Sequence, residues 1–304
     1  MTENEFLLED RISVIKSLIA KEGENKFYLS FSGGKDSTIL HRLLDIALPG
    51  NKIPRVFIDT GIEYNAIRKF VLGLAEKDDR FVIIKPSQPI KKVLETYGYP
   101  FKSKQHAHNV MVYQNSGIGR SVQRYLGIIE SNTLFRCPKM LEYQFTEDFK
   151  MKVSDQCCLR LKKMPAHKYE KESGRTIAIT GMRREEGGKR KSIKGCVLTD
   201  KEGNVRRFHP LLVVSEEWED WFAEREKIEL CELYRPPFNF KRTGCKFCPF
   251  SLDLEEQLEL AYRYMPNEAK QAEIIWKPVF DEYRRIGFRL HDTMQIKLDL
   301  EEDE

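Results

Sequence analysis

The stretch that most constrains the fold is FYLSFSGGKDSTILHRLLDIA, residues 27–47. An apolar, β-rich run leads into the polar turn SGGKDS, and a segment with helical periodicity follows. Glycines let a backbone approach an anion closely, and the first turn of a helix offers N–H groups and the positive end of its dipole. Lys35 adds a positive charge. The sequence therefore predicts a turn between a strand and a helix that binds the phosphate end of a ligand.

Three further short, apolar, β-rich runs follow in the sequence. Helical segments separate the first three of the four predicted strands. This alternation is typical of βαβ units and predicts a doubly wound, mostly parallel α/β domain. We also expect an amphipathic helix over 5–22 and helices beyond residue 250. The predicted strands are 26–31, 54–59, 80–85 and 176–181, and the helices between them are 37–48 and 63–77.

Polar segments follow each predicted strand: SGGKDS, TGIEY, PSQ and MRREEGGKR. In an open parallel sheet, ligands bind in the crevice outside the carboxyl ends of the strands. We therefore expect the four loops to converge on one site. The first loop matches neither GxxxxGK[ST] nor GxGxxG, which argues against P-loop kinases, GTPases and dinucleotide-binding folds.

Composition adds few constraints. The formal net charge of +4 neither demands nor excludes a nucleic-acid partner. Basic runs at 181–195 and 204–210 contrast with an acidic end at 298–304, and the place of the first run beside the crevice favours contact with nucleotide phosphates. No apolar run reaches the length of a membrane span, and the N-terminus lacks the pattern of a signal peptide, so we expect a cytoplasmic protein without a membrane partner.

Four of the seven cysteines form two close pairs, Cys157-Cys158 and Cys245-x-x-Cys248. Four thiolates can hold a 4Fe-4S cluster or a tetrahedral zinc ion, although adjacent cysteines are unusual for zinc. Cys231 fits a core position. Cys137 and Cys196 lie beside basic residues, which lower the pKa of a thiol, so each is either structural or a sulfur carrier.

These motifs together resemble a known family. SGGKDS is similar to the PP-loop of the adenine-nucleotide α-hydrolase superfamily. The vicinal cysteines, the GMRREEGGKR segment, the FHPLL and ELYRPP segments and the final GCKFC follow the order of the phosphoadenylyl-sulfate reductase family over roughly 26–250. The resemblance implies an adenylyl nucleotide in the PP-loop and a 4Fe-4S cluster on Cys157, Cys158, Cys245 and Cys248.

The resemblance also implies a set of site residues. Lys35, Asp36 and Arg183 would act in catalysis. Asp59 matches the acid of the second-strand motif, with a helix N-cap alongside Thr60 as the alternative role. The residues expected to bind the nucleotide are Ser32, Gly33, Gly34, Lys35, Asp36, Ser37, Asp59, Gly181, Arg183, Arg184 and Arg190.

The chain departs from the family pattern at two places. Gly187 stands where the reductases commonly have serine, and no cysteine follows Cys248, although the reductases carry a nucleophilic cysteine near the C-terminus. We therefore expect an enzyme that uses ATP, with Mg²⁺, to activate an acceptor such as tRNA or DNA for sulfur transfer and that releases pyrophosphate. The sulfur would come from a donor protein or a thiol reductant.

Two alternatives stay open. The first is a reductase of adenylyl sulfate or phosphoadenylyl sulfate that uses Cys137, Cys196 or a partner's thiol. The second is a non-catalytic, nucleotide-sensing accessory subunit of a nucleic-acid modification or defence complex.

We predict four parts of the chain: an N-terminal helix over 1–25, the α/β domain with its iron-sulfur site over 26–250, a substrate-facing insert over about 101–152, and a helical region with an acidic tail over 251–304. Within the insert, His106 and His108 are expected on a solvated loop.

Overall fold

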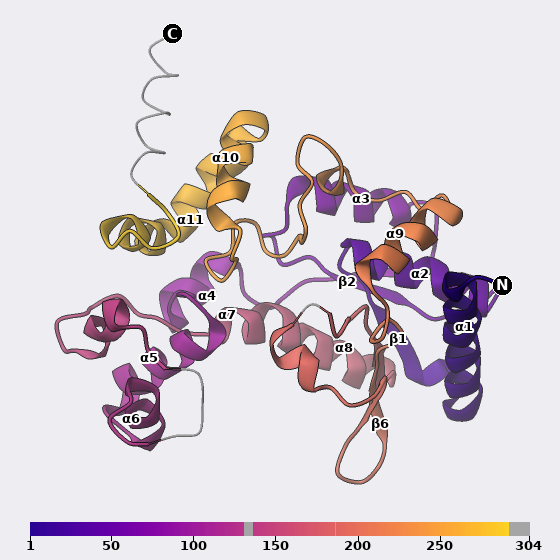
Figure 1. The fold of residues 1–304 in the computed structure, drawn as a ribbon, viewed down its shortest axis with the longest axis horizontal. Coiled ribbons are helices and arrows are strands. Elements are labelled where there is room, and N and C mark those ends of the chain that lie inside the picture. Colours follow the sequence, from indigo (N-terminus) through magenta and orange to yellow (C-terminus); the bar gives the residue numbers. More distant parts are fainter. Residues whose placement is uncertain (131–135, 186, 292–304) are drawn as a thin grey trace. The chain divides into compact units, whose positions relative to one another are not determined.

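A computed structural model describes residues 1–130, 136–185 and 187–291 (Figure 1). The chain forms two compact units. Unit 1 comprises residues 1–59, 63–85 and 165–243, and unit 2 comprises 60–62, 86–164 and 244–304. The predicted acidic tail at 298–304 lies outside the described residues, and the four-part division of the chain stays a prediction.

Unit 1 is built on a six-stranded sheet with the strand order β3-β2-β1-β4-β6-β5. Every neighbouring pair is parallel except β5 and β6, which are antiparallel, so the predicted mostly parallel, doubly wound α/β fold is confirmed. The sequence analysis missed β5 and β6, because these strands are only three and four residues long and neither is a continuous buried apolar run: β5 exposes Val197 and Thr199, and two arginines occupy the middle of β6. The strands are β1 Phe27–Ser30, β2 Arg55–Ile58, β3 Phe81–Ile84, β4 Ile177–Ile179, β5 Val197–Thr199 and β6 Val205–Phe208.

The strand order fixes where a ligand can bind. From β1 the chain proceeds outward through β2 to β3, and β4 then returns to pair with the other edge of β1, with Leu29 opposite Ile179. The direction of winding therefore reverses between β1 and β4. Such a reversal leaves a crevice at the carboxyl ends of the two strands, which is where open α/β sheets bind ligands.

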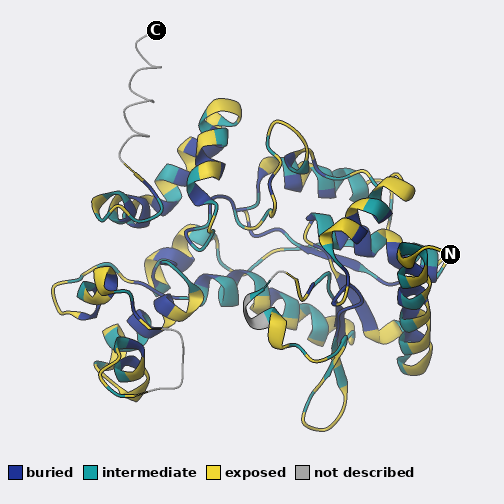
Figure 2. Ribbon diagram, in the orientation of Figure 1, coloured by how far each residue is buried: buried dark blue, intermediate teal, exposed yellow. Residues whose placement is uncertain are grey.

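Helices pack on both the sheet and one another in unit 1. Tyr169 of α8 packs on Tyr28, Val56 and Ala178 of the sheet, and its ring meets that of Tyr28 at 5.3 Å in an edge-on arrangement. Figure 2 shows the central strands β1 and β2 mostly in dark blue, because three of the four residues of each are buried. The helices are α1 Glu3–Glu22, α2 Lys35–Ala47, α3 Asn65–Ala75, α8 Met164–Ser173 and α9 Glu216–Arg225, with short 3-10 turns at Glu24–Lys26, Gly188–Ser192 and Glu232–Tyr234.

Unit 2 is helical in its described part. Phe101 and Tyr283, far apart in the sequence, pack edge to face at 4.7 Å and are both fully buried. A π-helical turn, Leu159–Lys163, directly follows α7. The α-helices are α4 Ile90–Tyr97, α5 Lys104–Ser116, α6 Arg120–Leu126, α7 Gln156–Cys158, α10 Leu254–Tyr264 and α11 Pro266–Arg285, with a 3-10 segment at Lys139–Phe145. Among the helices described in either unit, none has the length and apolar character that crossing a membrane requires.

His106 corrects one expectation. It lies in α5, not in a solvated loop, and its side chain is fully buried. Its ring nitrogens lie 3.0 Å from the hydroxyl of Tyr125 and 2.8 Å from Oε1 of Gln144. Burial lowers the pKa of His106 to about 4. His108, by contrast, is exposed and lies 3.6 Å from Asp155.

This burial predicts acid sensitivity. The unfolded chain takes up a proton on His106 near pH 6.5, whereas the folded chain resists it until about pH 4, so stability falls as the pH drops through this window. The loss reaches about 3 kcal/mol at the lower end. We expect His106→Gln to reduce the slope of unfolding free energy against pH by up to about 1.4 kcal/mol per unit there. Urea titrations from pH 7 to pH 4 measure it, and an unchanged slope would contradict the assignment.

Candidate functional site

The turn after β1 has the backbone of an anion-binding loop. Gly33 has a φ of +74°, and a Cβ there would lie 2.7 Å from the Val71 side chain, so only glycine fits. Gly34 is the N-cap of α2 and brings no side-chain cap to the helix. Ser32 and Ser37 brace the turn: the Ser37 hydroxyl donates to the Gly34 carbonyl at 2.9 Å and accepts from the Ser32 N–H at 3.2 Å. The predicted strand-turn-helix geometry is present.

The loop after β4 meets this turn at the reversal of the sheet. A Cβ on Gly181 would lie 2.9 Å from the backbone carbon and oxygen of Asp36 and equally close to its Cβ. Backbone atoms cannot give way as a flexible side chain can. Gly181 is therefore a contact point that holds the first turn of α2 against the end of β4.

Two hydroxyl groups line the loop from the C-terminal part of unit 1. The side chains of Tyr234 and Thr243 are 2.5 Å apart, and both hydroxyls lie within 3.5 Å of the position that a Cβ on Gly34 would take. Burial raises the pKa of Tyr234, and the nearby backbone N–H of Lys35 opposes this shift. A side chain at position 34 would require these hydroxyls to shift by a few tenths of an ångström, so the second glycine of the turn is favoured but less strictly required than Gly33.

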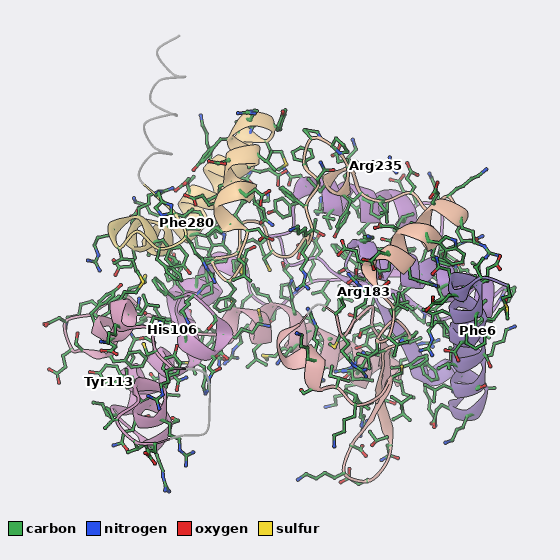
Figure 3. The ribbon with its side chains drawn as sticks, in the orientation of Figure 1. Phe6, His106, Tyr113, Arg183, Arg235 and Phe280 are labelled. Atoms are coloured by element: carbon green, nitrogen blue, oxygen red, sulfur yellow. The ribbon has the colours of Figure 1, made fainter. Side chains whose placement is uncertain are left out.

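The charged residues of the site form one network. Arg183, only 8% exposed, lies 3.6 Å from Asp36 and 3.2 Å from Glu219 through its Nε atom (Figure 3). Its terminal nitrogen forms an ion pair with Glu185 at 2.8 Å. Lys35 Nζ contacts the exposed Asp220 carboxylate at 2.6 Å. The two predicted catalytic cations are thus held by carboxylates of the neighbouring loop and of α9.

Glu219 is a member of this charged network that the sequence analysis did not predict. Its side chain is fully buried in α9 beside Asp36. Burial, together with the negative charge of Asp36, raises the pKa of Glu219 well above its ordinary range, although Arg183 and Lys35 oppose the shift. Burial beside Asp36 therefore favours the protonated form of Glu219. Of the two acids Asp36 is the more accessible, with 30% of its side chain exposed.

The remaining predicted residues are placed as follows. Asp59, 7% exposed, follows β2 and pairs with Arg68 at 3.1 Å. It does not cap a helix, because α3 begins at Asn65 with Tyr64 as its N-cap. Arg184 is exposed and donates to the Ile193 carbonyl at 3.2 Å, while Arg190 lies in the 3-10 turn that follows Gly187. Nucleotide binding by these two arginines stays a prediction.

The four paired cysteines all lie in unit 2 and within electrostatic range of one another. Cys157 is influenced by Cys158, Cys248 and Cys245, in that order of strength. Burial and a hydrogen bond to Cys158 raise the pKa of Cys157, whereas that bond and Lys104, Lys162 and Lys163 lower the pKa of Cys158 to about 6. The sequence pairs are thus brought together from positions almost ninety residues apart.

The loop of Cys245 and Cys248 is held by α11. Lys246 pairs with Glu268 at 2.8 Å, and the Lys246 carbonyl accepts from the Trp276 indole at 3.0 Å. The Tyr283 hydroxyl donates to the Pro249 carbonyl at 2.9 Å. The fully buried Phe247, between the two cysteines, adopts a left-handed φ of +47°. Such strain persists only where surrounding packing enforces it, and it is common at functional sites.

The described residues include no group of three or more histidine, cysteine or acidic side chains arranged to hold a single metal ion. Four thiols in one unit are a donor set that either a zinc ion or an iron-sulfur cluster can use. An iron-sulfur cluster is wider than a single ion, so its thiolates stand further apart, and four cysteines are its ordinary ligand set.

The other cysteines differ in environment. Cys137 and Cys231 are buried, and burial raises the pKa of Cys137 to about 12 and that of Cys231 above its ordinary value. The prediction that basic neighbours lower the pKa of Cys137 is therefore wrong, because desolvation outweighs the charge of Lys102. Cys196 is half-buried, and Arg11 donates to its sulfur at 3.4 Å.

Comparison with known families decides the assignment. Residues 121–251 match the family model of the phosphoadenosine phosphosulfate reductase domain. This part of the chain is similar to the domain of that family. The match spans the cysteine pairs, the arginine-rich loop and α9. The family resemblance inferred from the sequence is confirmed.

Individual relatives are more distant. An uncharacterized protein of Methanocaldococcus jannaschii is 30% identical over 108 residues, which are 35% of this chain and 26% of that protein, so the chain spans about a quarter of its length. A phosphoadenylyl-sulfate reductase structure from Candida auris gives a TM-score of 0.47 at 13% identity over 81% of this chain and 96% of that one. An NH3-dependent NAD synthetase structure from Campylobacter jejuni gives 0.42 at 15% identity, over 94% and 97%.

Sequence analysis missed four residues around the family's loop: Glu219, Asp220, Tyr234 and Thr243. Glu219 and Asp220 lie in α9, whose first turn is rich in glutamate. The local sequence therefore does not distinguish a buried carboxyl group from solvent-exposed ones. Tyr234 was part of a recognised motif, but its contact with the turn depends on the fold.

The contact at Gly181 gives a direct test. Gly181→Ala places a methyl group 2.9 Å from the Asp36 backbone and should cost about 1–3 kcal/mol of unfolding free energy. Gly195→Ala is the matched control, since a Cβ there meets nothing within 4 Å, and it should change stability by less than about 0.5 kcal/mol. Denaturant unfolding of both variants measures this, and equal effects would refute the close approach.

Proposed function

We propose that this chain is an enzyme that binds ATP in the PP-loop, activates an acceptor oxygen by adenylation with release of pyrophosphate, and thereby prepares that position for sulfur transfer. The observation that carries the proposal is the Asp36 carboxylate at the mouth of the phosphate-binding turn. Its side chain is about a third exposed, whereas its neighbour Glu219 is buried and protonated.

A carboxylate beside a phosphate repels it unless a cation lies between them. Mg²⁺ is bound in proteins through one or two carboxylates together with substrate phosphates, and it keeps several of its waters. Asp36 supplies the accessible carboxylate oxygen that this arrangement needs, and protonation of Glu219 limits the negative charge. The residues therefore fit Mg²⁺ bound with a triphosphate, and bound Mg²⁺ would neutralise charge on the phosphates.

The cations have separate roles. Lys35, which pairs with exposed Asp220, can exchange this partner for a phosphate oxygen, because a surface ion pair contributes little free energy. Arg183 is more firmly held by Glu185 and orients Asp36 and Glu219. In the reaction an acceptor oxygen forms a bond to the α-phosphorus, the bond from that phosphorus to the bridging oxygen breaks, and pyrophosphate leaves. A donor sulfur then displaces AMP from the activated position.

We further propose that Cys157, Cys158, Cys245 and Cys248 hold a 4Fe-4S cluster. Support comes from their gathering in unit 2, from the lowered pKa of Cys158, and from the bracing of the second pair by α11. The cluster would supply sulfur or electron-transfer chemistry when bound. The protein's own residues fix the ligand positions.

Reduction of adenylyl sulfate or phosphoadenylyl sulfate is the second candidate, favoured by the family. Cys137 is a poor nucleophile for it, since the thiol is buried and its pKa is raised to about 12. Half-buried Cys196 beside Arg11, or a thiol of another protein, would have to attack sulfur. Sulfite formation from either sulfonucleotide, abolished by Cys196→Ser, would favour this reaction. Binding without any turnover would instead favour the nucleotide-sensing accessory subunit.

The Mg²⁺ dependence of ATP binding tests the main proposal. In calorimetry, the wild-type chain should bind ATP more tightly with Mg²⁺ than with EDTA. Asp36→Asn removes the negative charge and should abolish most of this dependence, with affinity in Mg²⁺ falling at least about tenfold. Asp79→Asn, a change to an exposed aspartate of the same unit, is the control and should keep the dependence. Tighter binding of a sulfonucleotide than of Mg-ATP would refute the proposal.

Metal content tests the cluster. Chain purified without oxygen should contain about four iron and four sulfide per chain, and a Cys-to-Ser change at any of the four positions should lower both strongly. Cys196→Ser in unit 1 is the control and should leave the content unchanged. One zinc per chain without sulfide would show instead that the thiols form a zinc site.

A further inference from the structure

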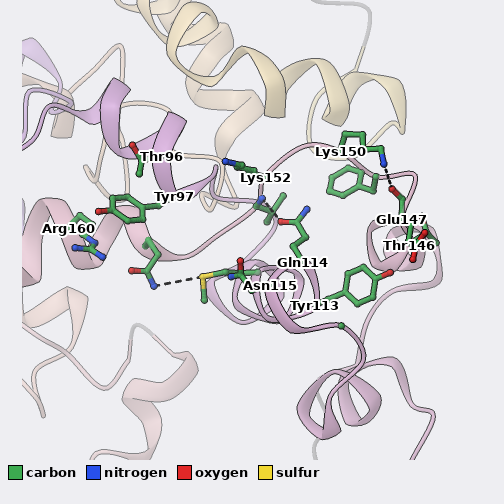
Figure 4. A pocket seen from close by; sticks show the side chains of 15 residues that line it. Thr96, Tyr97, Tyr113, Gln114, Asn115, Thr146, Glu147, Lys150, Lys152 and Arg160 are labelled. Atoms are coloured by element: carbon green, nitrogen blue, oxygen red, sulfur yellow. Dashed lines mark hydrogen bonds between the residues drawn. The ribbon is translucent and has the colours of Figure 1, made fainter.

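A large pocket lies wholly within unit 2, away from the residues assigned so far. Its volume is about 880 Å³. One wall is the segment around the first cysteine pair. Gln156 directly precedes Cys157, and Arg160, in the π-helical turn, lies two residues after Cys158. Figure 4 shows Arg160 and Tyr97 at one end of the pocket and Lys150, Glu147 and Thr146 at the other, with Lys152, Gln114 and Asn115 between them.

The pocket has an excess of positive charge. Three cations line it, Lys150, Lys152 and Arg160, against one carboxylate, Glu147. In the described part of the chain none of the three has a carboxylate within ion-pair distance: Lys150 donates to the backbone carbonyl of Glu147 at 2.6 Å, and Arg160 contacts the Met164 sulfur at 3.7 Å. The Nε atom of Arg160 is buried without a hydrogen-bond partner. Such a set of cations favours an anionic ligand.

The same pocket offers flat surfaces and amide groups. The Arg160 guanidinium carbon lies over the Tyr97 ring, 4.2 Å from its centre, and both residues line the pocket. Tyr113 and Phe149 add aromatic rings on the far side. Asn115 and Gln156 bring side-chain amides to the lining, and amides can hydrogen-bond the edges of bases. Phosphate-binding cations interleaved with aromatic platforms are the combination that binds single-stranded nucleic acid.

We propose that this pocket binds single-stranded nucleic acid, with a base stacked on the Arg160–Tyr97 pair and backbone phosphates on Lys150 and Lys152. The proposal rests on the proposed function, for which it identifies the acceptor class and the surface that receives it. Unpaired or extruded nucleotides suit the pocket, since a base must leave its stack to lie against the guanidinium.

The test uses the full chain with its cluster and fluorescently labelled single-stranded DNA and RNA of about 12 nucleotides, a length in the range of single-strand sites. Anisotropy without ATP should show that Lys150→Ala/Lys152→Ala weakens binding about tenfold or more and lowers the salt slope by about 1.4, the value for two phosphate contacts. Arg160→Lys keeps the charge but loses the stacked plane, and should weaken binding several-fold with the salt slope unchanged. Lys139→Ala/Lys277→Ala, exposed lysines of unit 2 outside the pocket, is the matched control.

Three outcomes would overturn the proposal. The first is equal affinity of the pocket variants and the control for the oligonucleotide, and the second is tighter binding of duplex than of single strands. The third is that AMP competes as well as unlabelled oligonucleotide when both concentrations are counted per nucleotide. The last would identify a mononucleotide subsite. Calorimetry with Mg-ATP separates this result from the main proposal, because the pocket variants should bind Mg-ATP normally and Asp36→Asn should bind the oligonucleotide normally.

Discussion

The structure of the candidate site depends on one close approach, that of Gly181 at the end of β4 to the backbone of Asp36 in the first turn of α2. Parallel pairing of β1 with β4 brings the two loops to the same edge of the sheet. The missing side chain at position 181 then lets the helix start lie against the neighbouring loop. Arg183, two residues further on, reaches both Asp36 and Glu219 because of this contact.

The charges around this contact agree with the proposed ligand, an anion accompanied by a cation. A fully ionised Asp36 and Glu219 would face each other with only Arg183 between them, and burial makes that arrangement costly. Protonation of Glu219 removes the conflict and leaves the exposed carboxylate of Asp36 available. The hydroxyls of Tyr234 and Thr243 complete the polar lining of the turn without adding charge.

Unit 2 places different chemistry on a short segment of helix. Cys157 and Cys158 face the other cysteine pair, whereas Gln156 and Arg160, one turn of helix around them, line the 880 Å³ pocket. The proposed cluster site and the proposed nucleic-acid site therefore share one helical segment, in which Arg160 belongs to the π-helical turn Leu159–Lys163. A ligand that orders Arg160 would act on the same turn that carries the cysteines.

The sequence by itself determined the parallel α/β class, the phosphate-binding turn and the grouping of four cysteines, because hydrophobic periodicity, glycine spacing and cysteine spacing are local patterns. The strands β5 and β6 were not predicted, since they are only three and four residues long and neither is a continuous buried apolar run. Only the tertiary structure decided that Glu219 is buried and protonated, that His106 lies in the core, and that Cys137 is desolvated despite its basic neighbours. Burial depends on what packs around a side chain, and those neighbours come from distant parts of the chain. The sequence did not predict the pocket for the same reason, because residues from two separate segments, 96–117 and 146–160, form its walls.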